Sequence, residues 1–148
     1  MKIVSIATSK KKGTQKAGVD EAFLIKEHGL KGDAHAGTWH RQVSFLASEE
    51  IDKAREKGLE VTFGDFAENI ATTGIDWKQL PVGTRVRLGA SVLVEITQIG
   101  KTCHKPCAIF YQAGDCIMPR EGVFARVLKG GTVQVDDPID ILSPEAGN

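Results

Sequence analysis

The sequence predicts a mainly β protein, a closed or partly open β-barrel with one or two short peripheral helices. Short runs of β-branched and apolar residues follow one another at close spacing, with glycine or Asp-Pro turn signals between them. Only one segment has the full pattern of a helix. A chain of 148 residues suits one domain, which we expect over residues 1–143, followed by a flexible tail over residues 144–148.

The first half of the chain is expected to hold three strands and the main helix. The strands cover residues 3–6, 22–25 and 41–46. A polar loop with four lysines separates the first two strands, and the adjacent Lys10, Lys11 and Lys12 are expected to be solvated because like charges repel. The helix is expected to begin with Ser48 as its N-cap and to stop at Gly58.

The second half is expected to hold a helical turn over residues 76–80, a β-hairpin and three more strands. The hairpin joins residues 84–88 to residues 91–99 through a two-residue Gly89-Ala90 turn. Its alternation of polar and apolar residues places Val92, Val94 and Ile96 on one face. The later strands cover residues 122–128, 132–135 and 139–142. Because strands dominate, the loops must carry the function.

The charges balance, with 19 Lys and Arg against 19 Asp and Glu and a sequence pI of about 6.9. Without a cationic excess there is no broad surface for a phosphate backbone, so nucleic acid is not an expected partner. No run approaches the roughly 18 to 20 apolar residues of a membrane span, and the N-terminal apolar run is too short for a secretory signal. We therefore expect a cytoplasmic protein without membrane contact.

Three cysteines, Cys103, Cys107 and Cys116, crowd into one stretch of the chain. An odd count so closely spaced is a poor disulfide framework and favours a reactive or metal-binding cluster. Lys101 and His104 lie beside the first two thiols, and positive neighbours favour the thiolate, which is the form that ligates metals or attacks sulfur. Cys116 is interpreted as a buried, inert thiol.

Zinc is a minor alternative for these thiols. Cys103, Cys107, His35 and His40 could supply four ligands, and the spacing within each pair is compatible with zinc knuckles. A chain of this length has a core and does not need a structural metal to fold, so zinc is not the leading hypothesis.

A glycine-bounded loop before the third strand is the second candidate site. It contains Asp33, His35, His40 and Arg41. Glycine lets the backbone approach a ligand, and His and Arg can donate to an anion. Equally, Asp33 can satisfy its own turn, and His40 can cap a loop. Further along, Arg126 stands in an apolar strand, where it either pairs with an acid or faces a cavity as an anion site.

Several segments, in order along nearly the whole chain, resemble the MOSC domain family. This family is found at the C-terminus of molybdenum cofactor sulfurases, in mitochondrial amidoxime-reducing components and in small stand-alone bacterial proteins. The matching segments are residues 32–37, 40–44, 66–70 and 80–84, the cysteine loop, and residues 122–131. The resemblance implies a β-barrel, in agreement with the strand pattern, and a binding site for a pterin-based molybdenum cofactor.

The resemblance also implies roles for individual residues. Cys107 follows a Lys-Pro step, as the family's key cysteine often follows a basic residue or proline, and is expected to be the thiolate ligand of the metal. Cys103 would be an assisting thiol, and Asp33 completes the expected catalytic set. The residues expected to bind the cofactor and offset its negative charge are His35, His40, Arg41, Asn69, Lys101 and Arg126.

The implied function is a molybdenum-dependent oxidoreductase that reduces N-hydroxylated small molecules with electrons from a separate donor protein. One alternative is a carrier of persulfide sulfur or of the cofactor that serves a molybdoenzyme partner. Another is a regulatory binding module with inert cysteines. The sulfurases carry an aminotransferase-like domain that this sequence does not contain, which argues against pyridoxal phosphate as a cofactor. The sequence also lacks the extra β domain of the amidoxime reducers, so a second copy of the chain, in a homodimer, could complete the cofactor cage.

Overall fold

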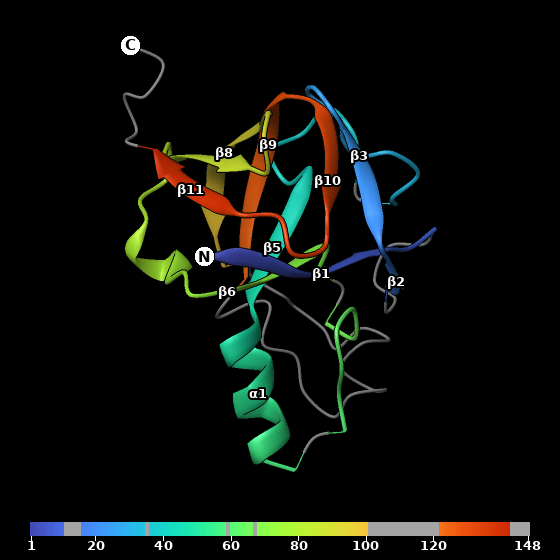
Figure 1. Cartoon of the computed structure of the whole chain (residues 1–148), viewed down its shortest axis with the longest axis vertical. Coiled ribbons are helices and arrows are strands. Elements are labelled where there is room, and N and C mark those ends of the chain that lie inside the picture. Colours follow the sequence, from blue (N-terminus) through green and yellow to red (C-terminus); the bar gives the residue numbers. More distant parts are fainter. Residues whose placement is uncertain (11–15, 35, 59, 67, 101–121, 143–148) are drawn as a thin grey trace.

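Strands make up most of the secondary structure (Figure 1). The computed structural model describes residues 1–10, 16–34, 36–58, 60–66, 68–100 and 122–142. In these residues the elements are β1 (Lys2–Thr8), β2 (Ala17–Val19), β3 (Glu21–Ile25), β4 (Gly29–Leu30), β5 (Val43–Ala47), α1 (Ser48–Glu56), β6 (Ile70–Thr73), the 3₁₀ helix η1 (Trp77–Gln79), β7 (Arg85–Leu88), β8 (Val92–Ile99), β9 (Val123–Lys129), β10 (Gly131–Gln134) and β11 (Ile139–Leu142). The mainly β class is confirmed, and the expected tail over residues 144–148 lies outside the described residues.

The hairpin of β7 and β8 forms for the reason that the sequence suggests. Its apolar residues Val92, Val94 and Ile96 are fully buried on one face, as expected from their alternation. Leu88 pairs directly with Val92, so the turn has three residues, and the expected two-residue turn was wrong. The turn begins with Gly89, whose φ of 64° lies in the left-handed region that glycine adopts without strain.

Eight strands form one curved sheet in the order β11-β7-β8-β9-β5-β6-β1-β2, and β10, β3 and β4 form a second sheet. Paired strands are antiparallel except β5 and β6, which run parallel and are connected through α1. The start of β1 meets the chain before β11, where the Ile3 amide donates to the Asp137 carbonyl at 2.9 Å and the Ile139 amide donates to the Met1 carbonyl at 3.1 Å.

The barrel expectation is supported only in part. A single bridge, between Lys2 and Pro138, joins β1 to the segment before β11, whereas a closed barrel needs a continuous ladder at that junction. The large sheet therefore curls until the start of β1 reaches the segment before β11, without closing.

Helix α1 projects from one end of the sheets (Figure 1). Its N-cap is Ala47, which makes no side-chain capping bond, and Ser48 is the first helical residue, so the expected Ser48 cap was wrong. The Ser48 hydroxyl instead lies 3.4 Å from a Glu49 carboxylate oxygen. Glu49 and Glu50 occupy the first turn, where negative charge complements the helix dipole. The helix ends before Gly58, as expected.

The apolar residues form two clusters, on opposite faces of the large sheet. The main core lies inside the curve of the sheet and includes Trp77, whose ring centroid is 4.7 Å from that of Phe45. Trp77 belongs to η1, so the expected helical turn is confirmed. The second cluster lies between the other face and α1. Its buried members are Leu46, Ile51, Ala54, Val61, Phe66, Ala71 and Phe124. Among the described residues, no helix is long and apolar enough to cross a membrane.

Candidate functional site

A row of polar side chains crosses the sheet on the face opposite the main core. Strand alternation turns Ser44 of β5 to this face, because its neighbours Val43 and Phe45 belong to the main core. The Ser44 amide and hydroxyl donate to the Asn69 side-chain oxygen at 3.0 and 3.2 Å. The Asn69 amide nitrogen Nδ2 donates to the Ala7 carbonyl at 3.1 Å. Asn69 thus ties β1 to β5 at the start of β6, and its buried side chain has a fixed orientation.

Asp33 extends this row with a buried ion pair. Its carboxylate oxygen Oδ1 lies 2.7 Å from the Lys16 ammonium, and the side chains of both residues are completely buried. The Ser9 amide donates to the same oxygen at 3.0 Å, and the Lys16 ammonium also donates to the Ser9 hydroxyl at 3.1 Å. Burial alone would raise the pKa of Asp33, but the bonds from Lys16, Ser9 and Asn69 outweigh it and hold that pKa below its ordinary value. Asp33 is therefore an ionised acceptor.

Glu68, next to Asn69 in the chain, is a second buried carboxyl group with the opposite tendency. Its oxygens accept the amide of Gly64 at 2.6 Å and that of Phe66 at 3.3 Å. Burial raises its pKa to about 7, because the hydrogen bonds compensate only partly for lost solvation and the charge of Asp65 adds repulsion. The two buried carboxyl groups therefore have pKa values shifted in opposite directions, and Asp33 loses its proton at a lower pH than Glu68.

His40 lies beside the end of β8. Its ring nitrogen Nε2 lies at hydrogen-bond distance, 2.7 Å, from the side-chain oxygen of Gln98. The Thr97 hydroxyl donates to the His40 carbonyl. These contacts hold His40 against Thr97 and Gln98. Both residues shortly precede Gly100, after which the cysteine-bearing part of the sequence begins.

Arg41 is held by aromatic rings. Its guanidinium carbon lies 4.5 Å from the centre of the Trp39 ring and 5.7 Å from that of Phe124, both within cation–π range. Its nitrogen Nε is buried and has no hydrogen-bond partner in the described part of the chain. An oriented, desolvated donor of this kind is suited to an anionic acceptor.

Arg126 is engaged by acids. It belongs to β9 and shares its face with Phe124, opposite the main core. Its Nε donates to a Glu95 carboxylate oxygen at 3.0 Å, and its Nη1 lies 3.4 Å from a Glu27 oxygen. Of the two sequence-based interpretations, pairing with an acid is the one observed.

The cysteines lie outside the described residues. The same holds for His35 and Lys101, so the expected cysteine cluster and the zinc alternative are not located. The flanks of the segment over residues 101–121 are described, and the Gly100 amide donates to the Gly122 carbonyl at 2.6 Å. Both ends of that segment therefore leave the sheet at one point, beside Gln98 and Phe124. Elsewhere in the described chain, no three His, Cys, Asp or Glu side chains gather as a metal site.

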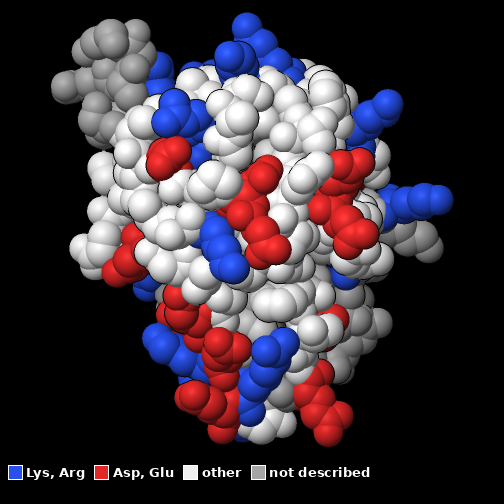
Figure 2. Space-filling model, in the orientation of Figure 1, with Lys and Arg blue, Asp and Glu red and all other residues white. Residues whose placement is uncertain are grey.

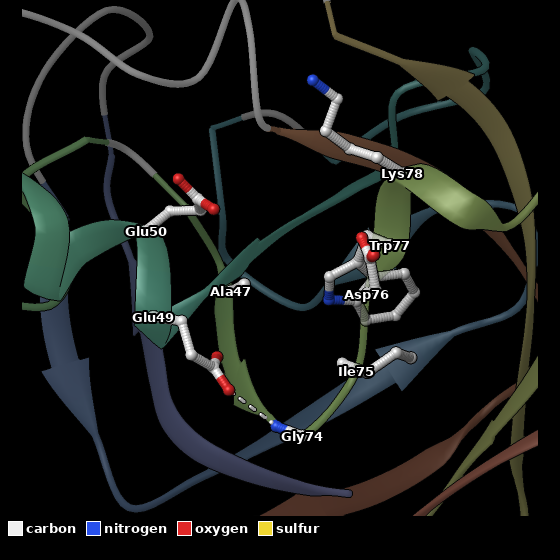
Figure 3. A pocket seen from close by; sticks show the side chains of 8 residues that line it. All are labelled: Ala47, Glu49, Glu50, Gly74, Ile75, Asp76, Trp77 and Lys78. Atoms are coloured by element: carbon white, nitrogen blue, oxygen red, sulfur yellow. Dashed lines mark hydrogen bonds between the residues drawn. The ribbon is translucent and has the colours of Figure 1, made fainter.

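A pocket of about 340 Å³ lies elsewhere, between the start of α1 and η1 (Figure 3). Its lining residues are Ala47, Glu49, Glu50, Gly74, Ile75, Asp76, Trp77 and Lys78. The Glu49 carboxylate is turned to the Gly74 amide, which donates to it at 3.0 Å, and Glu50 is paired with Lys53. Burial is the largest single influence on Glu49 and opposes its ionisation, but its hydrogen bonds together outweigh burial and lower its pKa overall. None of the expected site residues lines this pocket.

Lys16 and Glu68 were not expected to be part of the site. Lys16 is separated from the run of three lysines and precedes a small apolar pair, which is a weak signal for burial. Glu68 stands in the otherwise uncharged stretch from Phe66 to Ile70, where a charge is more conspicuous. Neither position reveals its partner, because the contacts join segments distant in the chain.

A curled β sheet with a buried polar row on its outer face defines a small, mainly β domain. A family model of the MOSC domain matches residues 32–140, and the chain belongs to the MOSC domain family. Domains of this family are associated with binding of the molybdenum cofactor. No curated protein sequence matches the chain.

Solved structures share the fold. The YuaD protein from Bacillus subtilis superposes with a TM-score of 0.79 at 18% identity, over 96% of this chain and 95% of that one. YiiM from Escherichia coli gives a TM-score of 0.67 at 25% identity, over 97% and 70%. YiiM from Geobacillus stearothermophilus gives 0.71 at 22% identity, over 96% and 75%.

Proposed function

We propose that this protein binds a molybdenum-pterin cofactor and reduces N-hydroxylated small molecules with electrons from a separate donor protein. The family supports the cofactor class. The observation that carries the proposal to this chain is Arg41, whose buried Nε has no acceptor in the described residues. The guanidinium is stacked in place before any ligand arrives, so a phosphate or oxo group would meet a preorganised donor.

The described residues fit such an anionic group at one end of the sheet. Arg41 is the leading candidate to donate hydrogen bonds to the phosphate, and His40 lies next to it in the chain. Asn69 and Asp33 are buried and hydrogen-bonded, so the proposal gives them the role of holding the surrounding loops in position. Arg126 is paired with two acids, which compensate its charge, so it would support the strands around the site and would not bind the cofactor directly.

The remaining assignments rest on the resemblance. Cys107 would be the thiolate ligand of the metal and Cys103 an assisting thiol, with His35 and Lys101 adding positive charge around the pterin. The cofactor supplies two-electron redox chemistry when bound. Reduction of an N-hydroxylated amine breaks the N–O bond, consumes two electrons and two protons, and releases the amine and water.

Metal analysis tests the proposal. The protein is purified from a host that makes the cofactor, together with the Cys107→Ser and Arg41→Gln variants. We expect molybdenum in the wild type and roughly a 10- to 100-fold weaker retention in both variants. Arg85→Gln is the matched control, because the Arg85 Nε is also buried without a hydrogen bond, but this guanidinium lies 3.7 Å from the Glu95 carboxylate and away from Trp39 and Phe124. Wild-type protein without molybdenum would contradict the proposal.

Reductase assays with a chemical electron donor then separate the enzyme from the carrier. Turnover of a hydroxylamine substrate by the molybdenum-loaded protein supports the reductase. Persulfide on Cys107 detected by mass spectrometry, without reductase activity, would instead support a carrier of sulfur or cofactor. Measurement of the molar mass with and without cofactor tests whether a homodimer forms.

A further inference from the structure

The Lys16 ammonium is fixed by a chain of contacts that starts at Glu68. The Glu68 carboxylate accepts the Gly64 amide at 2.6 Å, and the Gly64 carbonyl accepts the Lys16 amide at 2.8 Å. From that anchored backbone the Lys16 side chain reaches the Asp33 carboxylate at 2.7 Å. The last of these contacts joins two buried charged groups, so it is strong and directional.

Gly64 leaves no room for movement in this chain of contacts. Its φ of 88° lies in the left-handed region, and a Cβ atom at this position would lie 2.2 Å from the Lys16 carbonyl oxygen. The two backbones are therefore packed as closely as glycine allows. The main chain of Lys16 cannot approach the turn at Gly64 more closely, and its amide holds it there.

Asp33, in turn, anchors the glycine-bounded loop that carries His35. Its carboxylate binds Ser9 and Lys16, and the Ala34 amide donates to the Ser9 carbonyl at 2.7 Å. A buried carboxylate that loses its cation is costly, so without Lys16 it would take up a proton or turn toward solvent. Either change would weaken the attachment of the loop to Ser9, the residue that follows β1.

We propose that Lys16 is a positioning residue of the cofactor site, and that Glu68 and Gly64 hold it against Asp33 so that the residue 32–37 loop keeps its binding geometry. This inference rests on the proposed function. It assigns no contact between Lys16 and the cofactor, since the Lys16 side chain is fully buried beneath the loop.

Two readouts test it in parallel. NMR titration of the carboxyl carbons reports the pKa of Asp33 in the cofactor-free chain, and metal analysis reports cofactor retention. In Lys16→Met we expect the Asp33 pKa to rise above its ordinary value and cofactor retention to fall roughly 10- to 100-fold. Lys16→Arg keeps the charge and should restore part of both. An Asp33 pKa that stays low in Lys16→Met would overturn the proposal.

A steric variant tests the same contacts without changing a charge. Gly64→Ala places a methyl group against the Lys16 carbonyl, whereas Gly58→Ala strains a similar backbone, with φ of 96°, in open space. We expect only Gly64→Ala to raise the Asp33 pKa and reduce retention. Equal effects of the two alanines would overturn the role of the contact with Lys16, and folded Lys16→Arg protein keeps the test open if Gly64→Ala does not fold.

The outcomes distinguish this inference from the proposed function. If the wild type holds no molybdenum, the proposed function fails, and the NMR titration alone decides whether Lys16 positions Asp33. If the wild type holds molybdenum and Lys16→Met retains it equally well, the proposed function stands and the positioning role is refuted.

Discussion

Single residues on the outer face of the sheet show how the same chemical group can acquire opposite properties. Asp33 and Glu68 are both buried carboxyl groups, yet the pKa of the first is lowered and that of the second is raised. The difference is the ammonium of Lys16, which bonds Asp33 directly, whereas Glu68 accepts amides at 2.6 and 3.3 Å. A charged partner compensates for burial better than neutral dipoles do.

Glu68 should make the fold less stable at high pH. Its folded pKa of about 7 exceeds its unfolded value, so the folded state binds more protons between these values and stability falls as the pH rises. Between about pH 5 and pH 8, ionisation of Glu68 alone should lower the free energy of unfolding by on the order of 3 kcal/mol. Glu68→Gln should remove that pH slope, as measured by denaturant unfolding at several pH values.

The matching control for this experiment is Glu60→Gln, at an exposed position of the same region. It should keep the wild-type slope. A Glu68→Gln protein whose stability varies with pH as the wild type does would show that Glu68 is not the titrating group.

Asp33 and Lys16 should be strongly coupled. Either Asp33→Asn or Lys16→Met removes one member of a buried ion pair, a change that typically costs about 3–5 kcal/mol. The double variant removes both charges and should cost less than the sum of the two single changes. A double-mutant cycle measured by denaturant unfolding gives the coupling, and additive effects would mean that the 2.7 Å pair contributes no net coupling.

The pair also has a defined acid limit. Since the folded pKa of Asp33 is lowered, its stabilisation is present above the unfolded value of 3.8 and is lost as the pH falls through the folded value.

At the scale of elements, strong alternation was predictable and short strands were not. The β8 strand follows from three apolar residues at every second position, and α1 from its acidic first turn and final glycine. The short strands β2, β4 and β6 have two to four residues each and no alternating pattern. They exist because neighbouring strands supply hydrogen bonds, which is information from the tertiary structure.

The η1 element stabilises the main core through Trp77. Trp77 is 2% exposed, its ring packs against Phe45, and its indole nitrogen donates to the Thr72 hydroxyl at 2.8 Å. Trp77→Ala should lower the free energy of unfolding by about 3–5 kcal/mol, and Trp77→Phe by less. Denaturant unfolding measures both changes.

An exposed apolar residue provides the comparison. Val82 is 57% exposed, so Val82→Ala should change stability by no more than about 0.5 kcal/mol. If Trp77→Ala were as mild as Val82→Ala, the ring would not be part of the folded core.

At the scale of the whole molecule, strand content could be predicted and closure could not. Counting strands and turns indicates a barrel, but the curvature of a sheet depends on twist and register between distant strands. The site is similar in this respect. Residue chemistry pointed to Asp33, Arg41 and Asn69, whereas the burial of Lys16 against Asp33 depends on how β1 and β2 pack beneath the glycine-bounded loop.

The balanced charge leads to a prediction about polyanions. The face shown in Figure 2 carries acidic and basic side chains interspersed, in keeping with 19 charges of each sign. We expect the protein to elute from a heparin column below about 0.15 M salt, because no extended field of one sign attracts a polyanion. Retention at much higher salt would reveal a basic surface.

The hydrogen bond between Gly100 and Gly122 marks the boundary between the strands and residues 101–121. Sequence changes on the two sides of this boundary should have different effects on the fold. The ladder of β8 and β9 pairs Ile99 with Val123. The strand pairing therefore offsets the entropic cost of bringing together the two ends of residues 101–121. Substitutions, insertions or deletions in that segment need not alter the register between β8 and β9. The sequence of the cysteine-bearing residues 101–121 can therefore diverge at a different rate from the sequences of the strands, since the ladder fixes the two attachment points.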